Sequence, residues 1–367
     1  MKRLLCLLSS MNTGGAETFL MKVYRCLDRS KYQMDFCVHV AEHCDYEDEI
    51  LQLGGRFFRI PSKSSDANRF QKQLFQLIRD NQYQNVLKIT SNAAGFWDLK
   101  IAKKAGAIHT VARSSNSEDG GGLKQQVAHR LGRILWMRYV DVMLAPSDLA
   151  ARYTFGAKAF QDGRVQLLNN GLDLDCFHFL PEERAKLRAE LGAGENTPVL
   201  GHVGRFNPQK NHKFLIRVFE AFHSKDPNAL LVLVGVGDLE AEIRQQVLQA
   251  GLSNYVRFMG LRQDIPALLS AFDVFVFPSL YEGMPNTVIE AQACALPCVL
   301  SNQITSQANL SGRLRYMPLT EPEAWANEIE NVLLSGRVPV KMEAYDIHAV
   351  AEQFCRICYS GAEEELV

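Results

Sequence analysis

The sequence has no long hydrophobic run. None of its apolar stretches approaches the roughly 20 residues that a bilayer-spanning helix needs, so no transmembrane helix is predicted among its 367 residues. The first residues, MKRLLCLLSSM, combine basic and apolar side chains as a signal peptide does. Their apolar part is short, however, and a Gly-Gly turn follows in place of an A-x-A-like cleavage site. We therefore expect a buried strand there.

The sequence also lacks an excess of charge of either sign. Its 40 Lys and Arg residues balance 41 Asp and Glu residues, which leaves a net charge of −1. Proteins that bind nucleic acid normally carry a strongly positive surface, so we expect no nucleic acid partner. Hydrophobic residues at 47% and charged residues at 22% are typical of a globular protein with a sizeable core.

Nine cysteines are present, but their spacing shows no disulfide framework. Unpaired thiols persist in a reducing compartment, so we expect a cytoplasmic protein, with the cytoplasmic face of the inner membrane as the second location to test. Cys355 and Cys358 form a C-x-x-C pair in a helical pattern, without a second such pair or a nearby histidine. We interpret them as buried thiols rather than as a metal or redox site.

Short β-rich runs alternate with helical patterns along the chain, and this alternation predicts α/β domains with parallel sheets covered by helices on both faces. A chain of 367 residues exceeds one typical hydrophobic core, so two domains are expected. The expected strands are Leu4–Leu8, Asp35–Val40, Arg56–Ile60, Asn85–Ile89, His109–Ala112 and Val142–Ala145 in the first half, and Val199–Val203, Leu230–Val234, Val256–Met259, Val274–Phe277 and Pro297–Leu300 in the second.

A linker is predicted near residues 170–197. An Asn-Gly turn signal opens it, and a polar helix at 181–191 and the loop GAGENTP follow. We therefore place one Rossmann-like domain at 1–172 and a second at 173–347.

The most informative stretch is FPSLYEGMPNTVIEAQACALPCVLSN, which contains Glu282 and Glu290. The apolar run 274–277 predicts a buried strand, and residues 286–294 predict a helix with Asn286 or Thr287 as its N-cap. One carboxylate therefore follows the end of a strand, and the other lies in the first turns of the next helix. Open α/β sheets bind ligands in the crevice between these positions.

This loop suits a nucleotide attached to a sugar. Helix N-termini and backbone N–H groups, here those of Gly283, Met284 and Asn286, favour phosphate. Carboxylates are poor phosphate ligands but good acceptors for ribose and hexose hydroxyls. The alternative is that Glu282 and Glu290 are two solvated glutamates beside an ordinary loop.

The loop GRFNPQKNH, residues 204–212, follows the first strand of the second half and precedes an amphipathic helix. Arg205 and Lys210 would project beside a helix N-terminus at the carboxyl end of the strand. A guanidinium, an ammonium and a helix dipole together can neutralise a diphosphate. A surface loop with two ordinary cations is the alternative.

Two glycine-containing turns allow a backbone to approach a ligand closely. Gly235 and Gly237 could open a dinucleotide-binding fingerprint, but Glu240 occupies the place of the third glycine, so NAD binding is weakly supported. The turn NTGGAE, residues 12–17, connects the first strand to the first helix and could bring Gly14 and Gly15 to a ligand. Structural turn glycines are equally common.

The segment 120–140 predicts a basic amphipathic helix, because it has no acidic residue. Its cations are Lys124, Arg130, Arg133 and Arg138, and the apolar residues Leu123, Val127, Leu131 and Ile134 fall on one helical face. Such a helix can lie on an anionic membrane through the N-terminal domain, or it can pack its apolar face into the core with a solvated basic side. The sequence leaves both alternatives open.

Taken together, these motifs resemble the retaining, nucleotide-sugar-dependent glycosyltransferases of family 4. The resemblance covers nearly the whole chain, through GGAE, NNGLDLDCF, GRFNPQKNH and EGMPNTVIEAQACALPCVLSN. It implies a GT-B fold, in which two Rossmann-like domains face a central cleft. The N-terminal domain would bind the acceptor and be completed by a C-terminal helix at 348–360, and the C-terminal domain would hold the donor.

The resemblance also implies roles for individual residues. Arg205 and Lys210 would hold the donor diphosphate, and with Glu282 they would form the catalytic set. Glu282 would contact the transferred sugar, and Glu290 the ribose. The implied donor-binding residues are Gly14, Gly15, Arg205, Lys210, Glu282, Gly283, Met284, Pro285, Asn286, Thr287 and Glu290.

One departure from the family pattern concerns the acceptor side. Family members usually carry a histidine after the strand that corresponds to residues 109–114, whereas this chain has Arg113 or Ser115 there. His109 lies earlier and is expected inside the strand. Arg113 and Asn116 are therefore the better candidates at the cleft, with His109 as a third.

The resemblance thus implies a retaining glycosyltransferase of surface-polysaccharide assembly. It would move a hexose or N-acetylhexosamine from a nucleotide sugar, with a UDP-sugar favoured over a GDP-sugar, to a glycan or lipid-linked acceptor. No cofactor or metal is expected, because no DxD pair follows a strand in the second half and Asp173-Leu174-Asp175 lies at the linker. The alternatives are a nicotinamide-dependent oxidoreductase and a catalytically silent binding subunit.

Overall fold

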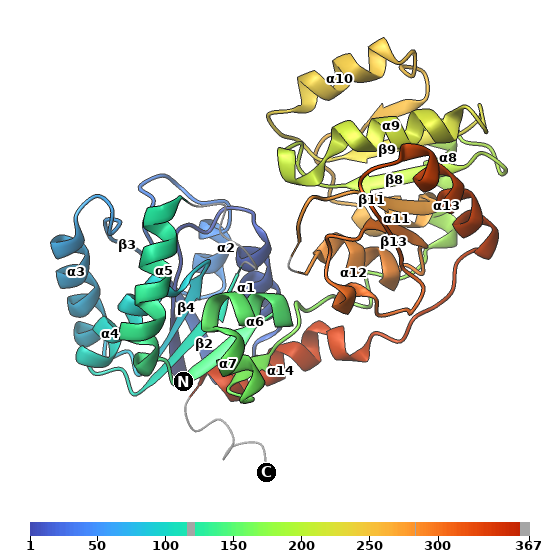
Figure 1. The fold of residues 1–367 in the computed structure, drawn as a ribbon. Coiled ribbons are helices and arrows are strands. Elements are labelled where there is room, and N and C mark those ends of the chain that lie inside the picture. Colours follow the sequence, from blue (N-terminus) through green and yellow to red (C-terminus); the bar gives the residue numbers. More distant parts are fainter. Residues whose placement is uncertain (116–121, 283, 360–367) are drawn as a thin grey trace. The chain divides into compact units, whose positions relative to one another are not determined.

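The chain folds into two compact α/β units, each built around one parallel sheet (Figure 1). The computed structural model describes residues 1–115, 122–282 and 284–359. The first unit comprises residues 1–172 together with the segment that starts at Glu343, and the second comprises Asp173–Met342. Residues 343–347, which the sequence analysis assigned to the second domain, belong to the first. There the Leu172 N–H donates to the Tyr345 carbonyl at 2.7 Å.

The first unit contains a seven-stranded parallel sheet in the order β3-β2-β1-β4-β5-β6-β7. Side chains of β1 alternate between its two faces: Leu4 and Cys6 join one core cluster, and Leu5 and Leu7 join the other. Its strands are β1 Lys2–Leu7, β2 Tyr32–Val38, β3 Phe57–Arg59, β4 Asn85–Thr90, β5 His109–Ser114, β6 Val142–Ala145 and β7 Val165–Leu167.

Helices cover both faces of this sheet, and α14 lies beside α1 although the two are far apart in the sequence (Figure 1). Phe354 of α14 packs edge-on against Phe19 of α1, with ring centroids 6.1 Å apart. The helices of this unit are α1 Gly15–Cys26, α2 Glu47–Gln52, α3 Ala67–Asp80, α4 Phe96–Lys104, α5 Leu123–Trp136, α6 Asp148–Phe155, α7 Ala157–Gln161 and α14 Ile347–Cys358, with short 3-10 turns η1 Ala93–Gly95, η2 Met137–Tyr139 and η5 Glu343–Tyr345. No helix in the described part of the chain is long and apolar enough to cross a bilayer.

The second unit repeats the strand order of the first six strands of unit 1, as β10-β9-β8-β11-β12-β13, again with every pair parallel. The strand order reverses between β8 and β11, and ligands of open α/β sheets bind at such a switch point, beyond the carboxyl ends of the strands. The elements are β8 Val199–Val203, β9 Leu230–Val234, β10 Val256–Phe258, β11 Val274–Phe277, β12 Cys298–Ser301, β13 Arg315–Met317, α8 Pro181–Leu191, α9 His212–His223, α10 Glu240–Gln249, α11 Ile265–Ala271, α12 Asn286–Ala293, α13 Pro322–Ser335, η3 Pro208–Lys210 and η4 Ser306–Ala308.

The α/β class and the parallel sheets predicted from the sequence are confirmed. The edge strand β13 was not predicted, because its three residues include the exposed Arg315 and form no apolar run. Cys355 and Cys358 are buried in α14, and burial raises the pKa of the Cys355 thiol to about 12. Their interpretation as buried thiols therefore agrees with their environment.

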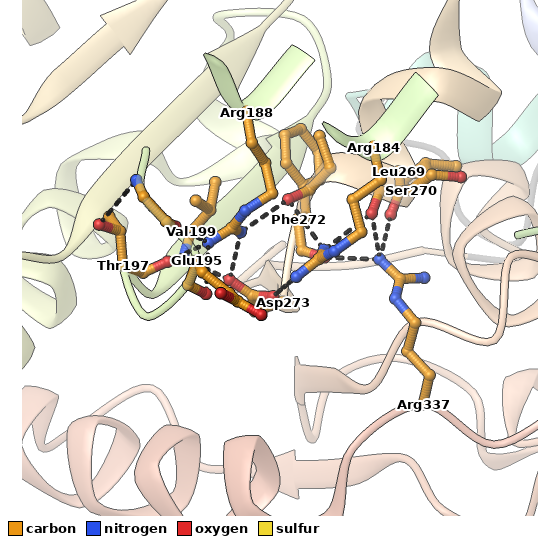
Figure 2. A network of polar contacts seen from close by, with 12 residues as sticks. Arg184, Arg188, Glu195, Thr197, Val199, Leu269, Ser270, Phe272, Asp273 and Arg337 are labelled. Atoms are coloured by element: carbon orange, nitrogen blue, oxygen red, sulfur yellow. Dashed lines mark hydrogen bonds and ion pairs between the residues drawn. The ribbon is translucent and has the colours of Figure 1, made fainter. Parts of the chain in front are cut away.

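At the amino ends of the central strands β8 and β11, Asp273 holds three structural elements together (Figure 2). Its carboxylate accepts from Arg184 at 2.5 Å, from Arg188 at 2.8 Å and from the Val199 N–H at 2.9 Å. Arg337 donates to carbonyls at the C-terminus of α11, including that of Leu269 at 2.7 Å. Cations at a helix C-terminus satisfy its unpaired carbonyls and favour the negative end of its dipole. The network fixes α8 against the start of β8 and β11.

Candidate functional site

In the second unit, the loops after β8 and β11 bring Lys210 and Glu282 into contact. The Lys210 ammonium donates to Glu282 Oε1 at 2.6 Å, and the two side chains are only 16% and 11% exposed. The loops are also joined through their backbones, because the Leu280 N–H donates to the Gln209 carbonyl at 2.8 Å. An ammonium and a carboxylate predicted from two separate motifs therefore lie side by side at the switch point of the sheet.

The glycines at 235 and 237 serve the loop that carries Lys210. A Cβ on Gly235 would lie 2.2 Å from the Gly204 carbonyl oxygen, and one on Gly237 would lie 2.6 Å from that of Phe206. The φ angle of Gly235 is +138°, a conformation that other residues rarely adopt. These glycines are therefore required for the packing of one backbone segment on another. In a dinucleotide fingerprint the space beside such glycines receives a pyrophosphate, whereas here the backbone of residues 204–206 fills it.

The Lys210 side chain packs on a cluster of aromatic rings. Its ammonium lies 4.5 Å from the ring centroid of Phe277, and the Phe277 ring stacks on His202 at 5.4 Å. His202 in turn meets the edge of His212, which stacks on Phe206 at 4.2 Å. Burial lowers the pKa of His202 well below its ordinary value and that of His212 to about 4, so both rings are neutral at pH 7. The sequence analysis did not identify these aromatic contacts to Lys210. The only feature of the sequence that could have indicated them is His202, which lies between Gly201 and Gly204.

The remaining predicted donor residues lie around the start of α12. Pro285, which has no side-chain acceptor, occupies the N-cap position, whereas the sequence suggested Asn286 or Thr287. Both of these already have helical geometry, because the extended backbone of Pro285 turns the chain into the helix one residue earlier. Met284 packs against the core and Glu290 is half-buried one helical turn further on. Gly283 lies outside the described residues.

Arg205 is exposed on the same loop as Lys210. Because the loop begins at the carboxyl end of β8, both cations belong to the ligand-binding edge of the sheet. Lys210 is held by its ion pair and by Asn207, whose side chain accepts from the Lys210 N–H at 3.1 Å. The Lys210 cation is thus preorganised, and Arg205 adds a second, exposed cation to the same loop.

In the first unit, Gly14 and Gly15 lie at the carboxyl end of β1, where Gly14 is the N-cap of α1. Asp45 holds the preceding residues in place, because its carboxylate accepts from the Thr13 N–H at 2.8 Å and from the Thr13 hydroxyl at 2.9 Å. Gly15 is exposed at the N-terminus of a 12-residue helix. This geometry can accept an anionic group.

Arg113, predicted at a cleft, is buried in the first unit with only 1% of its surface exposed. Its guanidinium lies 3.8 Å from the ring centroid of Phe19 and donates to Asn170 Oδ1 at 2.6 Å. Burial lowers the pKa of Arg113 to about 9. These contacts join β5 to Phe19 of α1 and to Asn170, which precedes the second unit. Arg113 therefore stabilises the interior of the first unit.

His109 begins β5 and therefore lies at the opposite end of the strand from the ligand-binding edge. Its Nε2 is 2.7 Å from the Ile357 carbonyl oxygen, and this contact fastens α14 to the sheet. Of the three predicted acceptor residues, His109 and Arg113 thus have structural partners, and Asn116 lies outside the described residues.

Asp173 and Asp175 form no pair suited to a cation. Asp173 Oδ1 accepts from the backbone N–H groups of Asp175 at 3.1 Å and Cys176 at 3.2 Å, as in a turn cap. Within the described ranges, no group of three or more His, Cys, Asp or Glu side chains is arranged to hold a metal ion.

Residues 13–176 match the family model described as Glycosyltransferase Family 4, and residues 197–335 match the one described as Glycosyl transferases group 1. The putative glycosyltransferase EpsF of Bacillus subtilis is 36% identical over 342 residues, which cover 92% of this chain and 89% of the relative. The UDP-Gal:alpha-D-GlcNAc-diphosphoundecaprenol alpha-1,3-galactosyltransferase of Escherichia coli is 34% identical over 142 residues, 38% of this chain and 37% of the relative.

Solved structures show the same fold over the full length. HepE of Anabaena in complex with UDP has a TM-score of 0.73 at 20% identity, covering 100% of this chain and 98% of that chain. A glycosyltransferase from Rickettsia africae has a TM-score of 0.74 at 15% identity, covering 100% and 97%. At these identities the likeness shows the fold alone, which is the predicted GT-B arrangement of two Rossmann-like domains.

Proposed function

The chain belongs to glycosyltransferase family 4, and we propose that it transfers a hexose or N-acetylhexosamine from a nucleotide sugar to a glycan or lipid-linked acceptor in the assembly of a surface polysaccharide. The observation that carries this proposal is the contact between Lys210 and Glu282 at the switch point of the second sheet. Departure of a nucleoside diphosphate requires cations, and selection of a sugar requires acceptors for its hydroxyls. This site supplies one of each, 2.6 Å apart.

Each group has a distinct role in the proposed transfer. Lys210 and Arg205 stabilise the negative charge that develops on the leaving diphosphate, and the N-terminus of α12 adds the positive end of a helix dipole. Glu282 accepts hydrogen bonds from the sugar and keeps the Lys210 ammonium in position. Glu290 accepts from the ribose hydroxyls. Retention of the anomeric configuration is proposed from the family, with same-face attack by the acceptor hydroxyl through an oxocarbenium-like state.

We favour a UDP-sugar as donor and a lipid-linked acceptor. The Escherichia coli relative is named for UDP-Gal and for a diphosphoundecaprenol acceptor, and HepE has been solved with UDP-glucose. Such an acceptor lies in a membrane, so we propose that the enzyme works at the cytoplasmic face of the inner membrane through a contact made by its first unit. Nucleic acid is not among the proposed partners.

Calorimetry with UDP, GDP, UDP-glucose and NADH tests the proposal. The wild type is expected to bind UDP and UDP-glucose but not NADH. Glu290→Gln should weaken binding of both UDP ligands, because a neutral acceptor replaces a charged one, whereas Glu282→Gln should weaken UDP-glucose and leave UDP almost unchanged. Equal losses for both ligands in both variants would contradict the assigned roles, and tight NADH binding without UDP binding would overturn the proposed function.

We propose that transfer needs no metal ion, because Lys210, Arg205 and the α12 N-terminus already supply positive charge where the diphosphate would lie. Full activity is therefore expected after dialysis against EDTA. The measurement is the initial rate of transfer before and after dialysis, with Mg²⁺ or Mn²⁺ added back. A rate that collapses in EDTA and recovers with either ion would show that a cation is required.

A nicotinamide-dependent oxidoreductase is less well supported. Its case depended on Gly235 and Gly237, which the structure places against the 204–206 backbone. A silent binding subunit was suggested by the absent histidine. The Lys210–Glu282 pair suits an active site, since a preorganised ammonium there can stabilise the charge that develops on a leaving diphosphate.

A further inference from the structure

Glu282 is held from both sides of β11. Toward β8, Lys210 pairs with its carboxylate at 2.6 Å. Toward β12, the backbone of Glu282 forms a parallel bridge with Ile304, which resumes the strand pairing that joins Phe277 to Leu300. The ion pair therefore orients the carboxylate, and the bridge fixes the backbone from which that carboxylate projects.

Ile304 belongs to the segment 302–311, which we call the β12 loop because it follows β12. The loop packs into the core of the second unit through Ile304 and Ala308, which are 4% and 0% exposed. Backbone groups that are carried into a core need hydrogen-bond partners, because an unpaired N–H or carbonyl away from water is costly. A single side chain of α12, Gln292, supplies several of them.

Gln292 is 1% exposed and uses its full hydrogen-bonding capacity. Its Oε1 accepts from the N–H groups of Leu310 and Ser311, both at 3.1 Å. Its Nε2 donates to the Ala308 carbonyl at 2.8 Å and to the Val288 carbonyl of its own helix at 3.2 Å. N–H groups at one end of the amide and carbonyls at the other permit a single orientation of the side chain. Gln292 therefore fastens the β12 loop to α12.

We propose that Gln292 is a positioning residue for Glu282 and thereby sets the affinity of the site for the sugar of the donor. The connection runs from the Gln292 amide through the β12 loop to Ile304, and across the bridge to Glu282. Tyr316 is a second tether of the same loop, because its hydroxyl donates to the Thr305 carbonyl at 3.1 Å. The inference rests on the proposed function, in which Glu282 accepts hydrogen bonds from the transferred sugar.

Calorimetry with UDP-glucose and UDP on Gln292→Met tests the inference. Methionine nearly keeps the volume of the side chain but removes all four hydrogen bonds of the amide. A displaced carboxylate loses much of a charge-assisted hydrogen bond, so binding of UDP-glucose should weaken at least about fivefold, with UDP within about twofold of wild type. Tyr316→Phe removes one hydrogen bond and should weaken UDP-glucose by roughly two- to threefold, again without an effect on UDP. This milder variant decides the question if Gln292→Met does not fold.

Ser270→Ala is the matched control. Ser270 is also fully buried in the second unit, and its hydroxyl accepts from the Leu180 N–H at 3.0 Å and donates to the Pro266 carbonyl at 2.9 Å. Its loss should lower the melting temperature, as Gln292→Met does, but keep the wild-type ratio of the affinities for UDP-glucose and UDP. An equal fall of this ratio in Ser270→Ala would show a general effect of destabilisation and overturn the proposal. So would a wild-type ratio in folded Gln292→Met.

Hydrogen exchange on the unliganded protein separates this inference from the proposed function. In Gln292→Met, backbone amides should exchange faster both in the β12 loop and in the segment that contains Glu282, whatever ligand the protein binds. Faster exchange confined to the β12 loop would overturn the positioning role. A wild type that binds neither UDP nor UDP-glucose would instead overturn the proposed function, and the exchange measurement would still decide whether Gln292 positions Glu282.

Discussion

Replacing Lys210 by alanine is expected to reduce the turnover number of glycosyl transfer by at least about a hundredfold, in line with loss of one preorganised charge-stabilising donor. The ammonium donates to Glu282 at 2.6 Å and lies against the Phe277 ring, and Asn207 fixes the residue by accepting from its backbone N–H. A cation fixed in this way stabilises a developing charge without reorganising during the reaction. Arg205→Ala should cause a loss of the same order, because we propose that this second cation contacts the same diphosphate.

Lys213→Ala is the control for a change of charge alone. Lys213 lies three residues further along, is exposed, and pairs with Glu242 at 2.7 Å on the surface. Its removal should leave the rate within about twofold of wild type, since exposed ion pairs contribute little. Steady-state kinetics on the variants, together with their melting curves, separate catalysis from folding. Near-wild-type turnover in Lys210→Ala or Arg205→Ala would refute the diphosphate assignment.

Asp273→Asn is expected to destabilise the second unit by about 3 kcal/mol, because it leaves two guanidinium groups without their carboxylate. Arg188 is the more costly of the two, since only 7% of its side chain is exposed. Trp325 is the sole tryptophan of residues 173–342 and is fully buried. Urea unfolding followed by its fluorescence, in a background with Trp97→Phe and Trp136→Phe, therefore reports on this unit.

Glu330→Ala provides the comparison for an ordinary surface pair. Its carboxylate lies 3.1 Å from the Lys225 ammonium, with the two side chains 60% and 39% exposed. Such pairs contribute roughly 0–1 kcal/mol, so the unfolding midpoint should barely move. If Asp273→Asn shifted the midpoint no more than Glu330→Ala does, the network in Figure 2 would not stabilise the unit as we infer.

The sequence predicted the strands well, because each central strand of a parallel sheet is a short apolar run between turn residues. The same property located the donor loops, since Lys210 and Glu282 each follow such a run. Their direct contact was not predictable. It depends on β8 and β11 being neighbours in the sheet, and strand order is set by packing between segments that are distant in the sequence.

Arg113 shows where sequence reasoning failed. A charged residue near the end of a strand suggests a ligand-facing position, but Phe19 and Asn170 cover this one, and both are far from it in the sequence. The orientation of α5 was equally unpredictable from the sequence: its aliphatic residues, such as Leu123 and Ile134, are exposed and do not pack into the core. Periodicity identifies an apolar face and not what it meets, and the residue that fixes the helix is Gly132, which has no side chain to signal a contact.

The contact between α14 and α1 also sets an order of events during synthesis. Residues 173–342 form a unit that is continuous in sequence, so its core can close once its own chain has left the ribosome. The core of the first unit cannot be completed until the end of the chain is made, because Phe354 and Tyr359 belong to the same core cluster as Phe19 and Tyr32. Until α14 emerges, those side chains face water or a chaperone. We therefore expect the half of the protein that is translated first to complete its core only after the chain of the second unit has been synthesised.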